Sequence, residues 1–379
     1  MAPRSIANSL EPIAPDEIFA LSGAYAKDTY PDKVNLAVGV YRTDDGKPWP
    51  LPVVKKTEKV LLEEDDPFRH EYSSIEGDAG FLEVARDLMF GFDKKTTPKD
   101  TIGRVSSVQS VAGTGANHLG AVFLKHHFKP KHVWLSDPSW ANHQTIWEVA
   151  GVNIKLYPYY DAVNRSLDFD GMVKTLESQA EEGDVVLLHA CAHNPTGLDP
   201  THEQWIVLAD LCERKGIFPF FDAAYQGFTS GSADEDAWAV RYFFTHKPNM
   251  EICVAQSFSK NFGLYGQRTG AFHFVMNGNF PDLKVNVSNN LCHFIRGEYS
   301  MGPRAGSTLV KRILNDDQLT AEWHENLKVM SSRIKSMRSS LYNELVRLQT
   351  PGRWEHIVQQ VCIRSCYTTL SMLLFESHD

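Results

Sequence analysis

The middle of the chain alternates between short apolar runs and longer amphipathic segments. Apolar runs within 132–140, 184–197, 216–225 and 252–255 end in polar or turn-forming residues, which is typical of buried strands. Apolar residues recur at helical spacing over 204–215, and a helical pattern of mixed charge covers 319–348. Because strands and helices alternate from residue 109 to residue 274, we expect right-handed crossovers, a mostly parallel sheet and therefore an α/β fold.

Further helices are expected before and beside these strands. Helical spacing is present near 15–26, 55–64 and 77–89. A strand that ends near residue 111 is followed by a glycine turn and a helix that runs to residue 127. At 379 residues the chain is longer than a typical single domain. We therefore expect one large domain and a smaller one.

The apolar run 252–255 is followed by a lone lysine, Lys260. A lysine just past a buried strand places its amine at the rim of the sheet, where α/β proteins usually bind ligands. Partial desolvation beside other cations lowers the pKa of such an amine and allows a Schiff base with a carbonyl group. Ser257 and Arg268 can bind a phosphate nearby. A ligand with a carbonyl and a phosphate suggests pyridoxal phosphate, and the alternative is a solvated loop with an ordinary surface arginine.

Other strand ends also carry groups that suit a flat ring. Asp222 follows an apolar run, where a carboxylate is costly unless it has a partner, and a protonated pyridine nitrogen would be such a partner. Tyr225 lies close enough in sequence to reach the same ring. Trp140 stands at the end of the 132–140 strand and can stack on a ring, although it can equally pack on its own core.

Two glycine-containing segments suit a close approach of backbone to a ligand. Gly113 and Gly115 precede a predicted helix, and the N–H groups at a helix N-terminus bind phosphate readily. The segment is not a Walker loop, because no Gly-Lys-Ser/Thr follows. Gly39 lies between valines, and either a ligand contact or a plain strand bulge explains it.

A metal site was considered for the strand at 184–197 and is not expected. His189, Cys191 and His193 alternate onto one face of a predicted strand, but no carboxylate joins them. The six cysteines are scattered without a Cys-x-x-Cys pair, and Cys191 and Cys253 fall in apolar runs, as reduced core thiols do.

Charge and composition limit the partners of this chain. The formal net charge of -9 argues against a nucleic-acid groove or an anionic membrane surface. No apolar run approaches the ~20 residues that span a bilayer. The N-terminal residues lack the apolar segment of a signal peptide, so we expect a cytoplasmic protein with small-molecule substrates, no nucleic acid and no membrane.

Three motifs occur in order along the chain: Asn-Pro-Thr-Gly at 194–197, Asp-Ala-Ala-Tyr at 222–225 and Ser-Phe-Ser-Lys-Asn-Phe-Gly-Leu-Tyr at 257–265. Together they resemble the fold-type I aminotransferases, above all the eukaryotic cytosolic aspartate aminotransferases. The resemblance runs from about residue 10 to residue 359. It implies an arm and the first part of a smaller α/β domain at 1–48, and a large domain with a mostly parallel seven-stranded sheet at 49–320. A long helix and the rest of the small domain would follow at 321–379.

The resemblance also implies the chemistry: a homodimer that uses pyridoxal 5′-phosphate to exchange amino groups between L-aspartate and 2-oxoglutarate, giving oxaloacetate and L-glutamate. Lys260 would form the Schiff base and carry the proton of the substrate α-carbon, while Asp222 would keep the pyridine nitrogen charged. The phosphate would be held by Ser257, Arg268, Gly113 and Thr114. The ring would contact Trp140, Asn194 and Tyr225.

Two residues are expected to act across the dimer interface. Tyr72 would reach the cofactor phosphate of the neighbouring subunit, and Arg296 would bind the distal carboxylate of its substrate. Gly39 would contact the α-carboxylate, with Trp140 and Asn194 also touching the substrate. The residues expected to take part in catalysis are Lys260, Tyr72, Asp222 and Tyr225, and support behind the ring is expected from His143 and His189.

The sequence departs from the family pattern at three places. Ala112 stands where the family has a serine beside the phosphate, and the segment 299–304 differs from the usual Ser-Asn-Pro-Pro. Residues 361–379 match nothing in the family, and the arginine that binds the α-carboxylate would have lain there. The alternative function is therefore a protein that binds pyridoxal phosphate but is impaired in catalysis.

Overall fold

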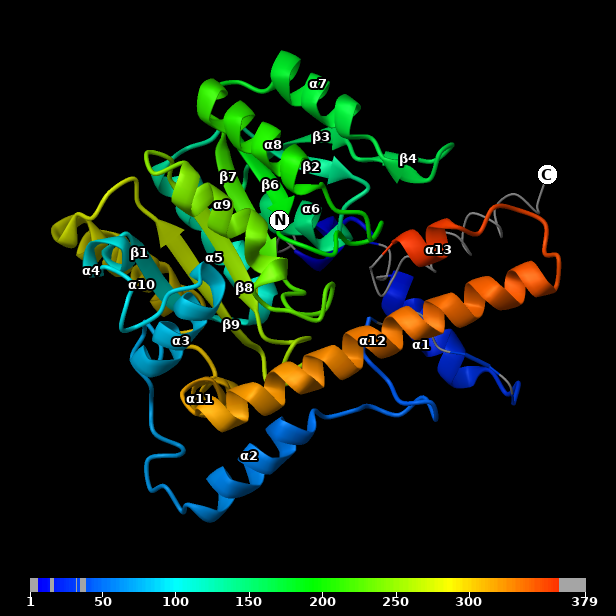
Figure 1. The fold of residues 1–379 in the computed structure, drawn as a ribbon. Helices are drawn as coiled ribbons and strands as arrows, with labels where there is room; N and C mark the ends of the chain where they lie inside the picture. Colours follow the sequence, from blue (N-terminus) through cyan, green and yellow to red (C-terminus); the bar gives the residue numbers. More distant parts are fainter. Residues whose placement is uncertain (1–5, 14–16, 32, 35–38, 361–379) are drawn as a thin grey trace.

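A seven-stranded sheet runs through the centre of the protein (Figure 1). The structure is a computed structural model that describes residues 6–13, 17–31, 33–34 and 39–360. The strand order is β1-β9-β8-β7-β6-β2-β3, and β9 alone runs against its neighbours. The strands are β1 (Val105–Val111), β2 (His132–Asp137), β3 (Asn153–Pro158), β6 (Val185–His189), β7 (Phe218–Ala223), β8 (Ile252–Ser257) and β9 (Thr269–Val275). The expected α/β fold with a mostly parallel seven-stranded sheet is confirmed.

Helices cover both faces of this sheet, which explains why β6, β7, β8 and β9 are buried along their whole length rather than on alternate residues. In β6, Val185 and Leu187 face one core and Val186 and Leu188 face the other. One core is shared with α5 (Ala112–His127), α6 (Ala141–Val149) and α10 (Pro281–Glu298). The opposite core is shared with α3 (Ala79–Phe90), α7 (Phe169–Gln179), α8 (His202–Lys215) and α9 (Trp238–His246).

The long helix α12 (Asp317–Arg347) crosses the molecule beside the sheet (Figure 1). Its buried Trp323 stacks on Phe262 with ring centroids 4.7 Å apart, and its indole Nε1 donates to the carbonyl of Asn261 at 2.9 Å. The two residues that follow Lys260 are therefore anchored to α12. This helix was expected over 319–348, and that prediction is confirmed.

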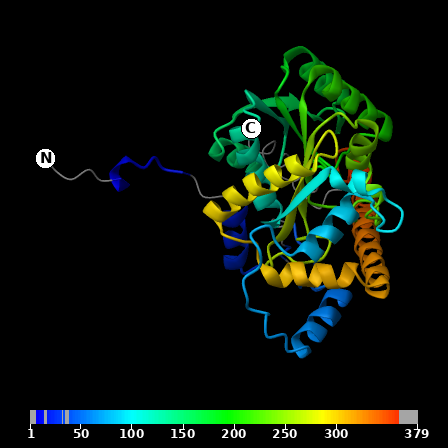
Figure 2. The ribbon, with the colours of Figure 1, turned by 90° about the vertical axis from the view of Figure 1, so that its left-hand side faces the viewer.

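The remaining elements lie around this framework. They are η1 (Ala7–Ser9), α1 (Glu17–Lys27), α2 (Pro52–Glu63), α4 (Lys99–Gly103), β4 (Tyr160–Asp161), β5 (Ser166–Leu167), η2 (Glu235–Ala237), α11 (Arg304–Leu314) and α13 (His356–Gln359). The N-terminal segment that carries η1 extends away from the rest of the protein (Figure 2). In the described part of the chain, no helix combines the length and apolar character needed to cross a membrane. The domain boundaries at 48/49 and 320/321 stay a prediction, although the whole seven-stranded sheet falls between them.

The glycine turn expected between β1 and α5 is absent. β1 ends at Val111 and α5 begins at Ala112, whose φ of 57° makes the change of direction in a single residue. The reason lies in β9, where Gly270 has no side chain: a Cβ there would lie 2.6 Å from the Ala112 carbonyl. Ala112 therefore sits directly on the neighbouring strand.

The expected alternation of three residues onto one strand face is also wrong. β6 ends at His189, so Cys191 and His193 belong to the loop that follows and not to the strand. Within the described residues, no cluster of His, Cys, Asp or Glu has the geometry of a metal site.

Candidate active site

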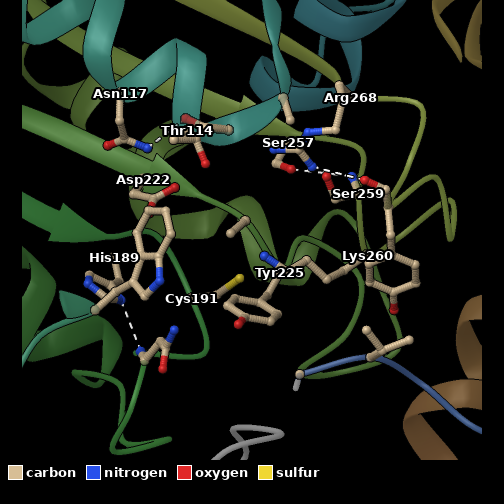
Figure 3. Close-up of a pocket in the computed structure, with 18 residues that line it drawn as sticks. Thr114, Asn117, His189, Cys191, Asp222, Tyr225, Ser257, Ser259, Lys260 and Arg268 are labelled. Atoms are coloured by element: carbon tan, nitrogen blue, oxygen red, sulfur yellow. Dashed lines mark hydrogen bonds between the residues drawn. The ribbon is translucent and has the colours of Figure 1, made fainter. Parts of the chain in front are cut away.

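A cavity of about 410 Å³ opens where the carboxyl ends of β6, β7 and β8 meet the N-terminus of α5 (Figure 3). This is the edge of the sheet at which open α/β proteins bind ligands. The cavity is lined by residues from separate stretches of the chain: Gly39, Val40, Ala112, Gly113, Thr114, Asn117, Trp140, His189, Cys191, Asn194, Asp222, Ala224, Tyr225, Ser257, Ser259, Lys260, Tyr265 and Arg268.

Lys260 enters the cavity from the segment after β8. Phe258 and Phe262, on either side of it, are wholly buried and pack with ring centroids 5.6 Å apart. Because both rings point into the core, the lysine between them is directed to the cavity. Its Nζ lies 4.7 Å from the centroid of the Tyr225 ring, within the range of a cation–π contact.

Asp222, at the end of β7, offers one free oxygen to the cavity side. Its Oδ2 contacts His143 Nε2 at 2.9 Å, while its buried Oδ1 has no hydrogen-bond partner. Burial raises the pKa of Asp222, but the hydrogen bond and charge of His143, helped by His189 and Lys260, outweigh it and leave the pKa lowered. The site therefore holds an ionised carboxylate with an unused acceptor.

Histidines support Asp222 from behind. Ser139 Oγ lies 3.0 Å from His143 Nδ1 and 3.5 Å from His189 Nε2. His189 Nδ1 accepts the backbone N–H of Asn194 at 3.0 Å, which fixes the loop after β6. Burial, together with the nearby His143, lowers the pKa of His189 to about 3, so this ring is neutral.

The opposite end of the cavity presents backbone N–H groups and an arginine. α5 begins there, and its first turn includes Gly113, which lies so close to β8 that a Cβ on it would be 2.9 Å from the Cβ of Ser257. Ala112 N–H donates to the carbonyl of Arg268 at 3.0 Å. Both of these residues have positive φ, 57° and 52°, a conformation costing about 1–3 kcal/mol that is common at ligand sites. Arg268 Nη1 donates to the Tyr265 carbonyl at 2.9 Å.

Nearly all of the predicted site residues meet in this one cavity. Those that line it are Gly39, Gly113, Thr114, Trp140, Asn194, Asp222, Tyr225, Ser257, Lys260 and Arg268. Tyr72 and Arg296 do not: Tyr72 is 82% exposed, and the exposed Arg296 donates to Ser300 Oγ outside the cavity.

Sequence reasoning did not single out several lining residues. Asn117 lies one helical turn after Gly113, and its Nδ2 donates to the Gly113 carbonyl at 2.9 Å. Tyr265 accepts the backbone N–H of Tyr41 at 3.1 Å and so ties the N-terminal segment to the cavity. The i, i+4 spacing from Gly113 was the available signal for Asn117. Others are Val40, Ala224 and Ser259.

Comparison with known proteins identifies the family. Residues 31–373 match the model of aminotransferase class I and II, so the match extends beyond residue 359, where we expected the resemblance to end. The L-tyrosine:2-oxoglutarate aminotransferase of Aspergillus ustus is 58% identical over 94% of this chain and 69% of its own. The structure of aspartate aminotransferase from Saccharomyces cerevisiae cytoplasm has a TM-score of 0.88 and 41% identity, covering 94% of this chain and 86% of that one. The aromatic-amino-acid aminotransferase of Burkholderia pseudomallei, covalently bound to pyridoxal phosphate, has a TM-score of 0.88 and 38% identity, covering 94% and 87%.

The chain belongs to the class I and II aminotransferases. It is an enzyme that transfers amino groups, and its cofactor is pyridoxal phosphate. The residues present fit this group. The unpartnered Oδ1 of Asp222 is a ready acceptor for a ring N–H, and the cradle beside Gly113 that a Cβ would fill has the N–H groups and cation that a phosphate needs.

Proposed function

We propose that this protein transfers the amino group of L-aspartate to 2-oxoglutarate. The observation that carries the proposal is the joint placement of the Lys260 amine and the unpartnered Asp222 oxygen in one cavity. The relative from Saccharomyces cerevisiae named aspartate aminotransferase supports the amino donor, and the Aspergillus ustus protein, named for 2-oxoglutarate, supports the acceptor.

In this proposal, Asp222 keeps a proton on the ring nitrogen. Its carboxylate is ionised and its Oδ1 is free to accept, so it favours the charged form of that nitrogen. When bound, pyridoxal phosphate supplies the aldehyde that receives the amino group and the ring that stabilises the electron pair released at the substrate α-carbon. His143 holds the carboxylate in place through its 2.9 Å contact with Oδ2.

Lys260 acts as the general acid and base. Its neutral Nζ would take the proton from the substrate α-carbon and pass it to the cofactor, a role that suits an amine held at the edge of a desolvated cavity. Tyr225 and Asn194 would bind the phenolic oxygen of the cofactor, and the ring of Tyr225 lies beneath Lys260 Nζ. Trp140 would stack on the cofactor ring.

The phosphate is held by the first turn of α5 and by side chains opposite it. Gly113 and Thr114 contribute N–H groups at the helix N-terminus, where the helix dipole favours an anion. Ser257 contributes a hydroxyl and Arg268 a guanidinium. Ala112 supplies no hydroxyl, so Asn117, one turn further along α5, is the additional polar side chain on this side of the cavity.

We further propose a cytoplasmic homodimer. Tyr72 and Arg296 lie outside the cavity of their own chain and are exposed, as is suitable for residues that act on a neighbouring subunit. Arg296 of each chain binds the distal carboxylate of the partner's substrate, and Gly39 contacts the α-carboxylate. The cytoplasmic origin given for the Saccharomyces cerevisiae relative supports the location.

A second amino donor, L-tyrosine, is favoured by one specific observation. The relative at 58% identity is named as an L-tyrosine:2-oxoglutarate aminotransferase. The cavity also has three aromatic side chains, Trp140, Tyr225 and Tyr265, against which a phenol ring can pack. Comparison of kcat/KM for L-aspartate and L-tyrosine, each with 2-oxoglutarate, decides between the two donors.

The test of the proposed function is an absorption titration of the purified protein with pyridoxal phosphate. Binding gives a visible band that is lost in Lys260→Ala and kept in Lys55→Ala, an exposed lysine on α2 that serves as the matched control. L-aspartate should then change the band, and 2-oxoglutarate should restore it. Turnover should fall by at least about 100-fold in Lys260→Ala. A cofactor band that forms but is changed by neither L-aspartate nor L-tyrosine would refute the proposal in favour of an impaired, cofactor-binding protein.

A further inference from the structure

Two segments outside the cavity pack against one another and carry the residues proposed to act across the dimer. The tyrosine segment (71–78) carries Tyr72, and the arginine segment (281–304), which is α10 and the loop after it, carries Arg296. Three hydrogen bonds join them directly: Ser73 N to Met301 Sδ at 3.2 Å, Arg304 Nη1 to the Glu71 carbonyl at 3.3 Å, and Ser288 Oγ to Glu76 Oε1.

A single buried side chain lies beneath both segments. Gln109, in β1, has no exposed surface. Its Nε2 donates to the carbonyl of Pro303 in the arginine segment at 2.7 Å. Its Oε1 accepts the N–H of Asp78 in the tyrosine segment at 3.4 Å, and its backbone N–H donates to the Glu76 carbonyl at 2.7 Å. Both halves of one amide are therefore used to connect two segments that are far apart in sequence.

Two glycines let the segments close over this side chain. A Cβ on Gly77, which has a φ of 109°, would lie 2.3 Å from the Cβ of Gln109. A Cβ on Gly302 would lie 2.7 Å from the Cγ of the same residue. The loop 299–304 departs from the family pattern, and its Gly302 fits this contact. Although its sequence departs from the family pattern, the loop 299–304 is therefore still held by Gln109.

We propose that Gln109 is a positioning residue that sets the spacing between Tyr72 and Arg296 for the active site of the partner subunit. The inference rests on the proposed function, in which those two residues act across the dimer. Without the amide, the two segments lose the buried connection that fixes them to β1 and to each other. A displacement of about 1 Å in a group that binds substrate can cost about 100-fold in rate, so the position of both residues matters.

The first test measures binding rather than turnover. Gln109→Met keeps the length of the side chain and removes both amide contacts. We expect the dissociation constants for pyridoxal phosphate and for maleate, an unreactive dicarboxylate, to rise by about 10- to 100-fold with the dimer intact. Gln226→Met is the matched control, because Gln226 is also buried and donates to two carbonyls, of Leu88 and Ala233, but does not contact either segment. Unchanged maleate binding in Gln109→Met overturns the proposal. If that variant does not fold, Gln109→Glu, which keeps an acceptor for the Asp78 N–H but loses the Nε2 donor to the Pro303 carbonyl, tests the same connection and should weaken maleate binding.

Mixed dimers test whether the effect crosses the interface. In a dimer of one Lys260→Ala chain and one Gln109→Met chain, the remaining lysine receives Tyr72 and Arg296 from a chain with an intact glutamine, so its site should have the wild-type KM for the dicarboxylate. With both changes in one chain and a wild-type partner, the KM should be raised as in the Gln109→Met homodimer. The reverse pattern would place the effect of Gln109 in its own cavity and overturn the proposal.

A third pairing separates failure of this inference from failure of the proposed function. A dimer of Lys260→Ala with Arg296→Ala should have one working site, because the intact lysine is served by the intact arginine of its partner. If this dimer cannot use a dicarboxylate, Arg296 does not act across the interface and the proposed function is at fault. If it works while the glutamine pairings show no difference, Gln109 alone is wrongly assigned.

Discussion

Replacing Gly120 with alanine should destabilise the protein, although alanine is the better helix former. Gly120 lies in α5, where the helix crosses the sheet. A Cβ added there would lie 2.5 Å from ring carbons of both Phe220 and Phe272. Both rings are wholly buried, so they cannot turn aside without disturbing the core.

Two opposing effects decide the magnitude. Gly→Ala within a helix is worth up to about 1 kcal/mol, because glycine loses more backbone entropy on folding. Overpacking a filled core costs about 1–3 kcal/mol. Since the added carbon meets two rigid rings at once, we expect overpacking to win and stability to fall by about 1–2 kcal/mol. The shift of α5 should also weaken pyridoxal phosphate binding, because Gly113 and Thr114 are in its first turn.

The assay is urea unfolding of Gly120→Ala beside Gly23→Ala, both without and with cofactor. Gly23 is in α1, and a Cβ there would meet no atom within 4 Å, so only the entropic gain remains. The two variants should shift the unfolding midpoint in opposite directions with similar m-values. A Gly120→Ala protein as stable as wild type would refute the idea that contact with the two rings fixes the position of α5.

Three further predictions concern buried and paired charges. Burial, together with Arg86, lowers the pKa of His273 to about 3. Below pH 6.5 the protein therefore takes up a proton when it unfolds, and its stability falls as the pH falls. Between pH 7.5 and pH 5, His273→Gln should lose about 2 kcal/mol less unfolding free energy than the wild type. The Glu298 carboxylate, which accepts a hydrogen bond from the His118 ring, raises the pKa of His118. The stabilisation from this pair is therefore present below pH 6.5 and is lost as the pH rises through the raised pKa. His118→Gln should make thermal stability less dependent on pH above neutrality. Asp236 accepts three backbone N–H groups of the loop 227–230. Asp236→Asn should lower the free energy of unfolding by about 1–3 kcal/mol, measured as a lower urea midpoint. An unchanged midpoint would show that the loop folds without these bonds.

The residues at the ends of the parallel strands could be found from sequence because burial and chemistry change there within a few positions. Asp222 follows four strand residues that are all buried, and Lys260 follows β8, which is buried throughout. A polar group directly after such a run marks the carboxyl end of a strand, and parallel strands bring these ends to one edge. The seven-stranded α/β architecture followed from the same alternation of strands and helices.

Other features depend on contacts that no local pattern reports. The carbonyl of Ala112, a residue with positive φ, fits only because of Gly270, which is remote in sequence and adjacent only through the pairing of β1 with β9. Asn117 resembles any polar residue in a helix until α5 is placed against the cavity. The function of Gln109 as a connection between two loops is equally invisible, since its partners are an N–H and two carbonyls, which every sequence contains.

The position of β9 has a consequence for how the protein is made. β9 is the last strand of the sheet to leave the ribosome, yet it lies between β1, the first, and β8. Until residue 275 has emerged, β1 has no strand beside it and the apolar strand β8 has an unpaired edge, the kind of surface that aggregates or recruits chaperones. The Arg268 carbonyl that accepts the Ala112 N–H arrives with the same strand. The chain is therefore expected to bind the cofactor only after the sheet is complete. Pyridoxal phosphate supplied during synthesis should raise the yield of folded protein, because it binds chains in which β9 has just joined the sheet.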